Sequence, residues 1–350
     1  MTAPVFRREP LLEILDHLER RLAAGAAALA IRVLDPDLGR GRYAGESIVH
    51  AGEAHVHRPF RVWVDLAERL GLRLLTPRVA PEPGLIELRF ERLAPADRVR
   101  PGGPGGGDAG DVTERYGQDS DFARIAKLED PGFVIDLTEA VVRARLGPRP
   151  RVLDLGVNTG DELVVIQRAM SAVALKLAPG VAPEVAPEVA PEVAPEVAPE
   201  VPIDGVGIDH SASALVTARA RFPAFRFLEA DLGALGSLEL GTFDLVISLN
   251  TLQSPGVDDR AVLRQVVQHH LAPGGAVILG LPNSRYAGGE IAYGARMKNF
   301  RQPELGLLIK DVAFYRKYLQ QHGRQVFVTG KHYVLVTGVM TAPAEPAELV

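Results

Sequence analysis

The chain has 350 residues, of which 47% are hydrophobic and 24% charged, and this balance excludes a wholly disordered protein. It contains no cysteine, which excludes disulfides, thiolate zinc sites, iron–sulfur clusters and a cysteine nucleophile. The formal net charge is −5, but five glutamates of one short repeat account for it, so the global charge indicates no particular partner.

Targeting signals are not evident in the sequence. No apolar stretch reaches the roughly 20 residues that a membrane helix needs, and the first ten residues lack the apolar core of a secretory signal. We therefore expect a cytoplasmic protein with no membrane partner.

Two segments of unusual composition divide the chain. Residues 95–112 contain the run PGGPGGG and are predicted to be a flexible linker. Residues 180–202 repeat the motif VAPE, in which a proline at every fourth position prevents both helix and sheet hydrogen bonding. We predict a small α+β domain of unknown role over 1–94, a larger domain over 113–340 with the repeat as an insertion, and a disordered tail over 341–350.

Residues 1–94 show the patterns of two helices and two strands. A leucine at every third or fourth position predicts a helix over Leu11–Leu22, and Pro59 opens a second helix that ends at Gly71. Short strands are expected at Arg73–Thr76 and Leu85–Phe90.

Three histidines lie close together in this first region, namely His50, His55 and His57. They have no carboxylate at ligand spacing, so we interpret them as solvated loop residues and predict no metal site.

Strands and helices alternate from residue 151 onward. The expected elements are strands at 151–155, 206–209, 226–229, 244–249 and 276–281, helices at 161–177, 212–222, 259–271 and 311–322, and a last pair of strands at 325–329 and 332–338. A further helix is expected at 131–146. This alternation predicts an α/β fold with a doubly wound, mostly parallel, seven-stranded sheet closed by an antiparallel C-terminal hairpin. His269 and His270, near a helix end, are interpreted as surface or capping residues.

Polar and glycine residues follow the first four of these strands. In strand order they are Asp154-Leu-Gly156-Val-Asn158-Thr-Gly160, Asp209-His210, Asp231-Leu232 and Asn250. Ligands of open α/β sheets bind beyond the carboxyl ends of the strands, where glycines let the backbone turn tightly. A carboxylate at Asp209 can accept hydrogen bonds from ribose hydroxyls, and one at Asp231 from an adenine amine. Together these residues predict an adenosine site.

The motifs VLDLGVNTG, VGIDHS, FLEADL, FDLVISLNTLQS and LAPGGAVILGLPNSRY resemble those of the class I S-adenosylmethionine-dependent methyltransferases, over about residues 112–338. The resemblance implies a Rossmann-like fold and S-adenosyl-L-methionine as the cofactor. It also implies roles for individual residues: Asp154, Gly156 and Gly160 around the methionine moiety, Asp209 with His210 at the ribose, Asp231 and Leu232 at the adenine, Asn250 near the sulfonium, and Tyr116, Arg115 or Arg124 in a lid. Asn158 replaces the middle glycine of the loop, which its tolerance of unusual backbone angles permits.

The resemblance further implies methyl transfer by in-line displacement to an acceptor, which we expect to be a small molecule. Segment 285–331 is basic with interleaved aromatic residues, and Arg285, Tyr286 and Lys298 are the expected acceptor contacts. Alternatives are an RNA or protein acceptor bound by that segment, or a regulatory protein that binds the cofactor without transfer. An NAD-dependent oxidoreductase is a lesser alternative, because two of the three glycines of its G-x-G-x-x-G fingerprint are missing. No catalytic base, metal or oligomeric state is assigned.

Overall fold

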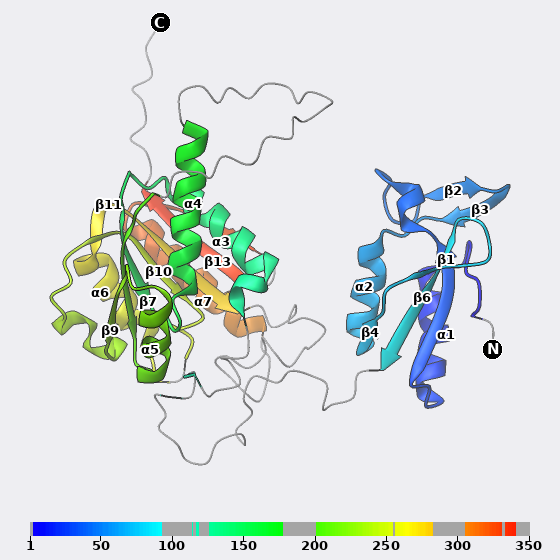
Figure 1. Cartoon of the computed structure of the whole chain (residues 1–350), viewed down its shortest axis with the longest axis horizontal. Coiled ribbons are helices and arrows are strands. Elements are labelled where there is room, and N and C mark those ends of the chain that lie inside the picture. Colours follow the sequence, from blue (N-terminus) through cyan, green and yellow to red (C-terminus); the bar gives the residue numbers. More distant parts are fainter. Residues whose placement is uncertain are drawn as a thin grey trace, which may run out of the picture. The chain divides into compact units, whose positions relative to one another are not determined.

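The computed structural model describes residues 3–92, 114, 117–118, 126–177, 201–254, 256–282, 305–330 and 333–340. Two compact units share these residues (Figure 1), one formed by 3–92 and the other by the later segments. The linker predicted at 95–112, the repeat up to residue 200 and the tail at 341–350 lie outside the described residues, so the domain boundaries stay predictions. No helix in the described segments is both long and apolar enough to cross a bilayer.

The first unit is the α+β unit that was predicted. Its elements are α1 (Leu11–Ala23), β1 (Ala28–Leu34), the 3-10 turn η1 (Pro36–Gly39), β2 (Ser47–His50), β3 (Glu53–Val56), α2 (Phe60–Arg69), β4 (Leu72–Leu74), β5 (Arg78–Val79) and β6 (Leu85–Arg92). Strand β6 pairs antiparallel with β1, β4 and β5. Ile14, Leu18 and Trp63 from the helices pack with Ile31 and Phe90 of this sheet to form the core of the unit.

The interpretation of the three histidines as solvated loop residues is wrong. His50 and His55 lie on the antiparallel hairpin β2–β3, and the side chains of His55 and His57 are 3% and 2% exposed. Gly52, which lies between His50 and His55, belongs to the two-residue turn of this hairpin, in which Ala51 and Gly52 both have positive φ. Burial lowers the pKa of His55, because the charged imidazolium is poorly solvated there.

The second unit is built around a seven-stranded sheet. Its elements are the 3-10 turn η5 (Lys127–Glu129), α3 (Pro131–Ala144), β7 (Arg151–Leu155), α4 (Asp161–Leu177), β8 (Asp204–Asp209), α5 (Ala212–Arg221), β9 (Arg226–Glu229), the 3-10 segment η6 (Leu232–Ser237), β10 (Phe243–Leu249), α6 (Asp259–Gln265), the π-turn η7 (Val266–His270), β11 (Leu271–Pro282), α7 (Leu305–Gln321), β12 (Arg324–Thr329) and β13 (Tyr333–Met340).

The strand order is β12-β13-β11-β10-β7-β8-β9. Strands β7 to β11 pair in parallel, whereas β13 runs antiparallel to both of its neighbours, β11 and β12. The last strand is therefore inserted between β11 and β12, and the predicted fold class is confirmed.

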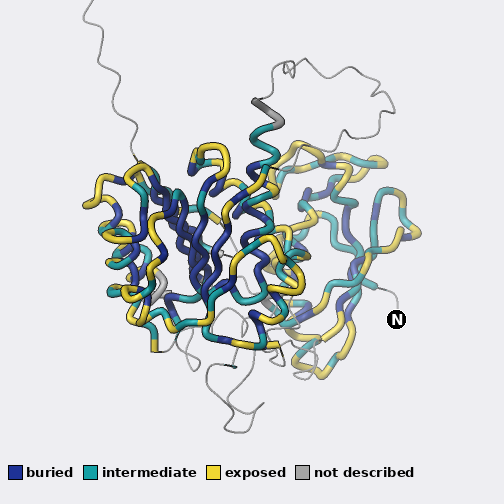
Figure 2. Tube along the Cα trace, turned by 60° about the vertical axis from the view of Figure 1, so that its left-hand side comes forward, coloured by how far each residue is buried: buried dark blue, intermediate teal, exposed yellow. Residues whose placement is uncertain are grey.

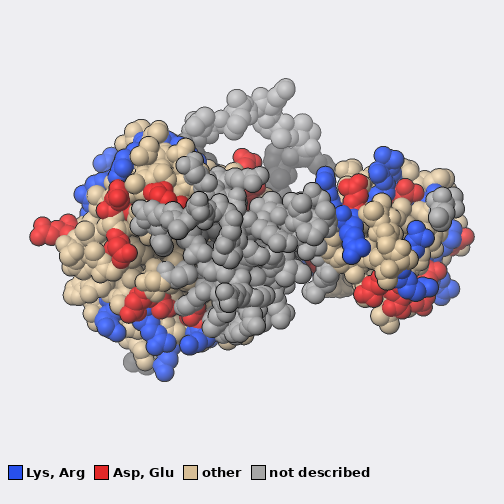
Figure 3. Space-filling view, turned by 90° about the horizontal axis from the view of Figure 1, so that it is seen from below, with Lys and Arg blue, Asp and Glu red and all other residues tan. Residues whose placement is uncertain are grey.

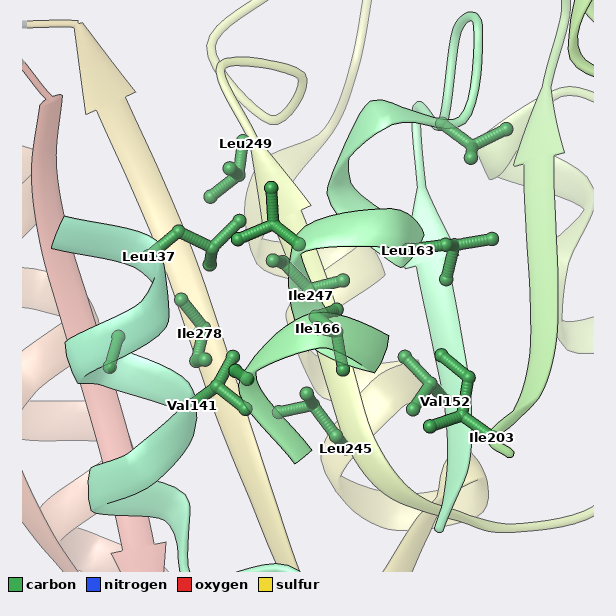
Figure 4. Close-up of a cluster of buried hydrophobic side chains, with 14 of the residues drawn as sticks. Leu137, Val141, Val152, Leu163, Ile166, Ile203, Leu245, Ile247, Leu249 and Ile278 are labelled. Carbon is green, nitrogen blue, oxygen red and sulfur yellow. The ribbon is translucent and has the colours of Figure 1, made fainter. Parts of the chain in front are cut away.

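Helices cover both faces of this sheet, because alternate strand residues point to opposite sides. On one face, Leu137 and Val141 of α3 and Ile166 of α4 pack against Ile247 and Ile278 (Figure 4). On the other face, α6, α7 and η6 pack against the intervening residues of the same strands, such as Val246 and Val277. The sheet strands form the buried centre of the unit (Figure 2).

The end of α6 differs from the expected continuous helix. The chain changes from an α-helix to a π-turn at Val266 and enters β11 directly at Leu271. This geometry places the His270 side chain inside the unit, 5% exposed, with its ring nitrogens 3.2 Å from the Gly241 carbonyl and 3.3 Å from the Leu235 carbonyl. The interpretation of His270 as a surface or capping residue is therefore wrong, whereas His269 is exposed.

Candidate functional site

The carboxyl ends of four adjacent strands meet at one edge of the sheet. Strand β7 lies between β8 and β10, and β8 lies next to β9, all in parallel. The residues predicted after each strand are thereby brought to the same edge, as a ligand crevice of an α/β sheet requires.

The loop after β7 is held in an unusual backbone conformation. Gly156, Asn158 and Gly160 have φ values of 82°, 47° and 88°, in the left-handed region that favours glycine and asparagine. The Gly156 amide donates to the Ile208 carbonyl at 2.8 Å, which ties the loop to β8. A Cβ at position 156 would overlap the side chain of Thr251, so only glycine permits this close approach.

Asp209, at the end of β8, connects the two neighbouring loops. Its Oδ2 accepts the backbone N–H of Asn158 at 2.8 Å, and its Oδ1 accepts that of Ser211 at 2.9 Å. A carboxylate can accept about four hydrogen bonds, so both oxygens keep capacity for a ligand. Asp209 is half-buried, and the adjacent His210 is half-buried as well.

Asp154, at the end of β7, is an almost fully buried acidic group at this edge. Its side chain is 1% exposed, and neither carboxylate oxygen has a hydrogen-bond partner among the residues that the structure describes. Burial, and next the negative charge of Glu162, raise the pKa of Asp154 well above its usual value, while Lys127 acts in the opposite direction. A buried acceptor without a donor is a costly arrangement that a bound donor would relieve.

Two ion pairs flank the loop, and the sequence did not point to either. Lys127 of η5 lies 2.7 Å from Oε1 of the buried Glu162, the second residue of α4. Arg221, at the end of α5, lies 2.7 Å from Asp161, the first residue of α4. The adjacent acidic residues that begin α4 are visible in the sequence as candidates for ion pairs. Their cationic partners lie far away in the sequence, so a local pattern could not identify them.

Asp231 and Leu232 lie at the end of β9. Asp231 is exposed and caps η6, since its Oδ1 accepts the backbone N–H of Gly233 at 2.6 Å. Leu232 is half-buried and packs with the core on one face of the sheet. Both residues therefore lie at the carboxyl edge of the sheet, and the Asp231 carboxylate is accessible to a ligand.

Asn250 follows β10 and also has a left-handed backbone, with φ of 59°. Its amide donates to the Gly280 carbonyl at 2.9 Å, and its side-chain Oδ1 is buried without a hydrogen-bond partner in the described part of the chain. Three residues on, Gln253 is 3% exposed, and its amide nitrogen lies 3.4 Å from the hydroxyl of Tyr315.

A short segment upstream of the sheet docks beside Asp209. Glu114 accepts hydrogen bonds from the side chains of Ser211 and Ser213 at the start of α5, and the Gln118 amide donates to the Ser213 hydroxyl at 2.9 Å. The hydrogen bond from Ser213, together with its neighbours, lowers the pKa of Glu114. Of the predicted lid, Tyr116, Arg115 and Arg124 lie outside the described residues, as do the predicted acceptor contacts Arg285, Tyr286 and Lys298.

Comparison with known protein families finds a similarity that includes part of this edge of the sheet. Residues 190–275 match the sequence model of a methyltransferase domain family. Over this stretch, the chain is similar to a methyltransferase domain. The matched stretch includes β8, β9 and β10, and with them Asp209, Asp231 and Asn250, but not the β7 loop. The resemblance to the class I S-adenosylmethionine-dependent methyltransferases is thereby confirmed, and S-adenosylmethionine is the cofactor of that class.

Solved structures similar to this chain are also methyltransferases. A TehB-like enzyme from Corynebacterium glutamicum is 15% identical, with a TM-score of 0.35, over 63% of this chain and 94% of that chain. A complex of the Haloferax volcanii Trm112 methyltransferase activator with a putative methyltransferase is 17% identical, with a TM-score of 0.40, over 66% of this chain and 99% of that chain. The plantazolicin methyltransferase BpumL, solved with a monoazolic desmethylPZN analogue and SAH, is 12% identical, with a TM-score of 0.40, over 60% of this chain and 84% of that chain. At such low sequence identities and TM-scores, these similarities say nothing about the methyl acceptor of this chain. No curated protein matches the chain.

Proposed function

We propose that the methyltransferase domain transfers the methyl group of S-adenosylmethionine to a small-molecule acceptor. The observation that carries this proposal is the convergence of the β7 loop, Asp209, Asp231 and Asn250 at one edge of a sheet whose last strand is inserted antiparallel. The family match over part of this edge supports it.

The described residues fit the cofactor at three points. Both oxygens of Asp154 and the Oδ1 of Asn250 are buried and have no hydrogen-bond partner among the residues that the structure describes, so a bound donor could satisfy them. Gly156 has no side chain where a Cβ would overlap Thr251, so the backbone of the β7 loop lies close to the residues that follow β10. We assign Asp209 with His210 to the ribose, Asp231 and Leu232 to the adenine, and the loop from Asp154 through Asn158 to Gly160 to the methionine moiety.

The bound cofactor supplies a sulfonium methyl, which the acceptor's lone pair takes while the carbon–sulfur electron pair stays on a neutral thioether. The chain's contribution to such a displacement is alignment and the exclusion of water, which requires no covalent nucleophile. The backbone hydrogen bonds of Asp209 to Asn158 and Ser211 hold the two loops in a fixed relation, so they act as positioning contacts.

A small acceptor is favoured by the motif that follows β10. On the face shown in Figure 3, basic and acidic side chains intermix over the described residues of both units. The motif after β10 is Asn250-Thr-Leu-Gln253, without the Pro-Pro-aromatic signature of enzymes that methylate base amines in nucleic acids.

The test has two arms. Titration calorimetry with S-adenosylhomocysteine should show binding, and incubation with methyl-labelled cofactor and a whole-cell extract should move label to a low-molecular-mass product. Label in RNA or protein fractions would contradict the small-molecule acceptor. Binding without transfer to any fraction would support a regulatory protein, and binding of NAD in place of S-adenosylhomocysteine would overturn the assignment.

A further inference from the structure

The loop after β10 lies on the side of the carboxyl edge that the proposed nucleoside leaves open. Strands β10 and β8 lie on opposite sides of β7, and the ribose and adenine are assigned to the ends of β8 and β9. The side chain of Thr251, in this loop, lies so close to Gly156 that a Cβ at position 156 would overlap it. The loop after β10 therefore touches the loop that is assigned to the methionine moiety, away from the nucleoside.

Gln253, in the same loop, carries a buried carbonyl oxygen that lacks a donor. Its side chain is 3% exposed, and its Oε1 has no hydrogen-bond partner within the described segments. A carbonyl oxygen in this state has lost its hydration without gaining a protein hydrogen bond, which destabilises the folded chain. A ligand group that donates a hydrogen bond to Oε1 would remove this cost.

Tyr315 of α7 decides which end of the Gln253 carboxamide faces it. The Tyr315 hydroxyl donates its only proton to Asp259 at 2.8 Å, so toward Gln253 it can only accept. The amide nitrogen of Gln253 must therefore be the atom that lies 3.4 Å from this hydroxyl. Because the Tyr315 side chain is fully buried, water does not compete for these positions. The oxygen of the carboxamide is thereby held on the side turned away from Tyr315.

A fixed carbonyl oxygen selects among the groups that can accept a methyl. A carboxylate has no proton to donate to it and would be repelled. A hydroxyl can donate, but it becomes a good nucleophile only when a base takes its proton, and a carboxamide is not such a base. An unprotonated amine donates an N–H to the oxygen and still keeps its lone pair for the methyl. The carbonyl oxygen of Gln253 therefore favours an amine.

We propose that Gln253 is a specificity-determining residue that selects a small-molecule amine as the methyl acceptor, with Tyr315 and Asp259 as its positioning residues; this step rests on the proposed function. The unprotonated amine donates one N–H to Oε1 of Gln253, and its lone pair points at the sulfonium methyl. The nitrogen–carbon bond forms as the carbon–sulfur electron pair passes to the sulfur, and the ammonium that results releases one proton to the solvent.

The first test identifies the atom that receives the methyl. The full chain is incubated with a whole-cell extract and S-adenosylmethionine that carries ¹³C in its methyl group, and the carbon chemical shift of the low-molecular-mass product is measured. A shift typical of an N-methyl group supports the inference. A methyl carbon on oxygen, sulfur or carbon overturns the inference alone, whereas no labelled product in any fraction overturns the proposed function and the inference with it.

The second test separates acceptor binding from cofactor binding. Gln253→Leu keeps the approximate size of the side chain but removes the carbonyl oxygen. The extract concentration that gives half the maximal transfer rate should rise about tenfold, the scale of one lost hydrogen bond, while the affinity for S-adenosylhomocysteine measured by calorimetry stays the same. An unchanged half-saturating concentration overturns the inference, and so does a parallel loss of cofactor affinity, which would indicate a purely structural role.

A pair of tyrosine variants tests the positioning role. Tyr315→Phe removes the hydroxyl that orients the carboxamide, so it should raise the half-saturating extract concentration and leave the affinity for S-adenosylhomocysteine unchanged. Tyr318→Phe is the matched control, because the buried Tyr318 hydroxyl on the same helix has no hydrogen-bond partner in the described part of the chain. Equal half-saturating concentrations in the two variants overturn the inference. If Gln253→Leu does not fold, as judged by thermal unfolding, this comparison still decides the matter.

Discussion

Two asparagines of the candidate site, Asn158 and Asn250, occupy left-handed backbone positions. Asparagine visits this region more readily than other residues with a side chain. At Asn158 the conformation aims the backbone N–H at Asp209, and at Asn250 it aims the amide at Gly280. Two of the described residues with a strained backbone therefore belong to the candidate site, and such strain is common at functional sites.

Removing the carboxylate of Asp209 should weaken cofactor binding. Asp209→Ala deletes the proposed ribose acceptor and also the acceptor of two backbone N–H groups, so we expect a loss of about 1–3 kcal/mol in binding free energy. Calorimetry with S-adenosylhomocysteine measures it. Asp204→Ala is the matched control, because Asp204 begins the same strand at its far end and pairs with Arg151, and its affinity should be unchanged. Equal affinity in both variants would remove Asp209 from the site.

A side chain at position 156 should disrupt the loop. Gly156→Ala forces alanine into a φ of 82° and drives its methyl into Thr251, which should cost about 1–3 kcal/mol of the free energy of unfolding. Denaturant unfolding measures this loss. Gly147→Ala is the control, since nothing lies within 4 Å of its added carbon, and its stability should change by less than about 0.5 kcal/mol. A neutral Gly156→Ala would show that the loop readily adopts another path.

At the scale of elements, caps and ion pairs attach the helices to the site. Ser211 caps α5, with its hydroxyl accepting the Ala214 amide at 3.2 Å, and the same hydroxyl donates to Glu114. One residue therefore fixes both the helix start and the upstream segment. Tyr315 of α7 plays a comparable part for the loop after β10, since its hydroxyl accepts a hydrogen bond from Gln253 and donates one to Asp259 at 2.8 Å. Burial, and next the hydrogen bond to Asp259, raise the pKa of Tyr315.

The layer that α3 and α4 form over the sheet should contribute much of the free energy of unfolding of the second unit. Ile166→Ala removes a fully buried side chain from this layer and should cost about 2–5 kcal/mol of unfolding free energy. Ile135→Ala on α3 makes the same chemical change at a side chain that is 56% exposed, and should change stability by less than about 0.5 kcal/mol. Similar losses in the two variants, measured by denaturant unfolding, would contradict the assigned core.

At the scale of the whole chain, two units have separate cores. The first is built around Trp63 and its neighbours, and the second around the two faces of the seven-stranded sheet. Since the chain has one tryptophan and it is buried in the first unit, tryptophan fluorescence reports the unfolding of that unit alone.

Ligand binding should therefore stabilise one unit and not the other. Saturating S-adenosylhomocysteine should raise the unfolding midpoint followed by far-ultraviolet circular dichroism, since binding at 100 times the dissociation constant adds about 2.7 kcal/mol. The midpoint followed by Trp63 fluorescence should not move. A single transition that both signals share, and that the ligand shifts in both, would show that the units unfold together.

Much of the second unit could be predicted because its signals are local. The strands at Arg151–Leu155 and Arg226–Glu229 and the helix at Asp161–Leu177 have the expected bounds, since apolar runs, caps and glycines act over a few residues. The hairpin turn at Ala51 and Gly52 was missed, because alanine is a poor predictor of a positive φ. The strand β1 was missed for a different reason, since its apolar run gave no clear period.

By itself, the sequence determined the strand ends, their polar residues and the resemblance that these carry. The tertiary structure alone decided which of those residues share an environment. Lys127 and Glu162, 35 positions apart, pair at 2.7 Å, and Asp154 has no hydrogen-bond donor in the part of the chain that the structure describes. Charge and burial at a site depend on groups that distant parts of the chain bring together. A local sequence pattern contains no information about which of these groups come into contact.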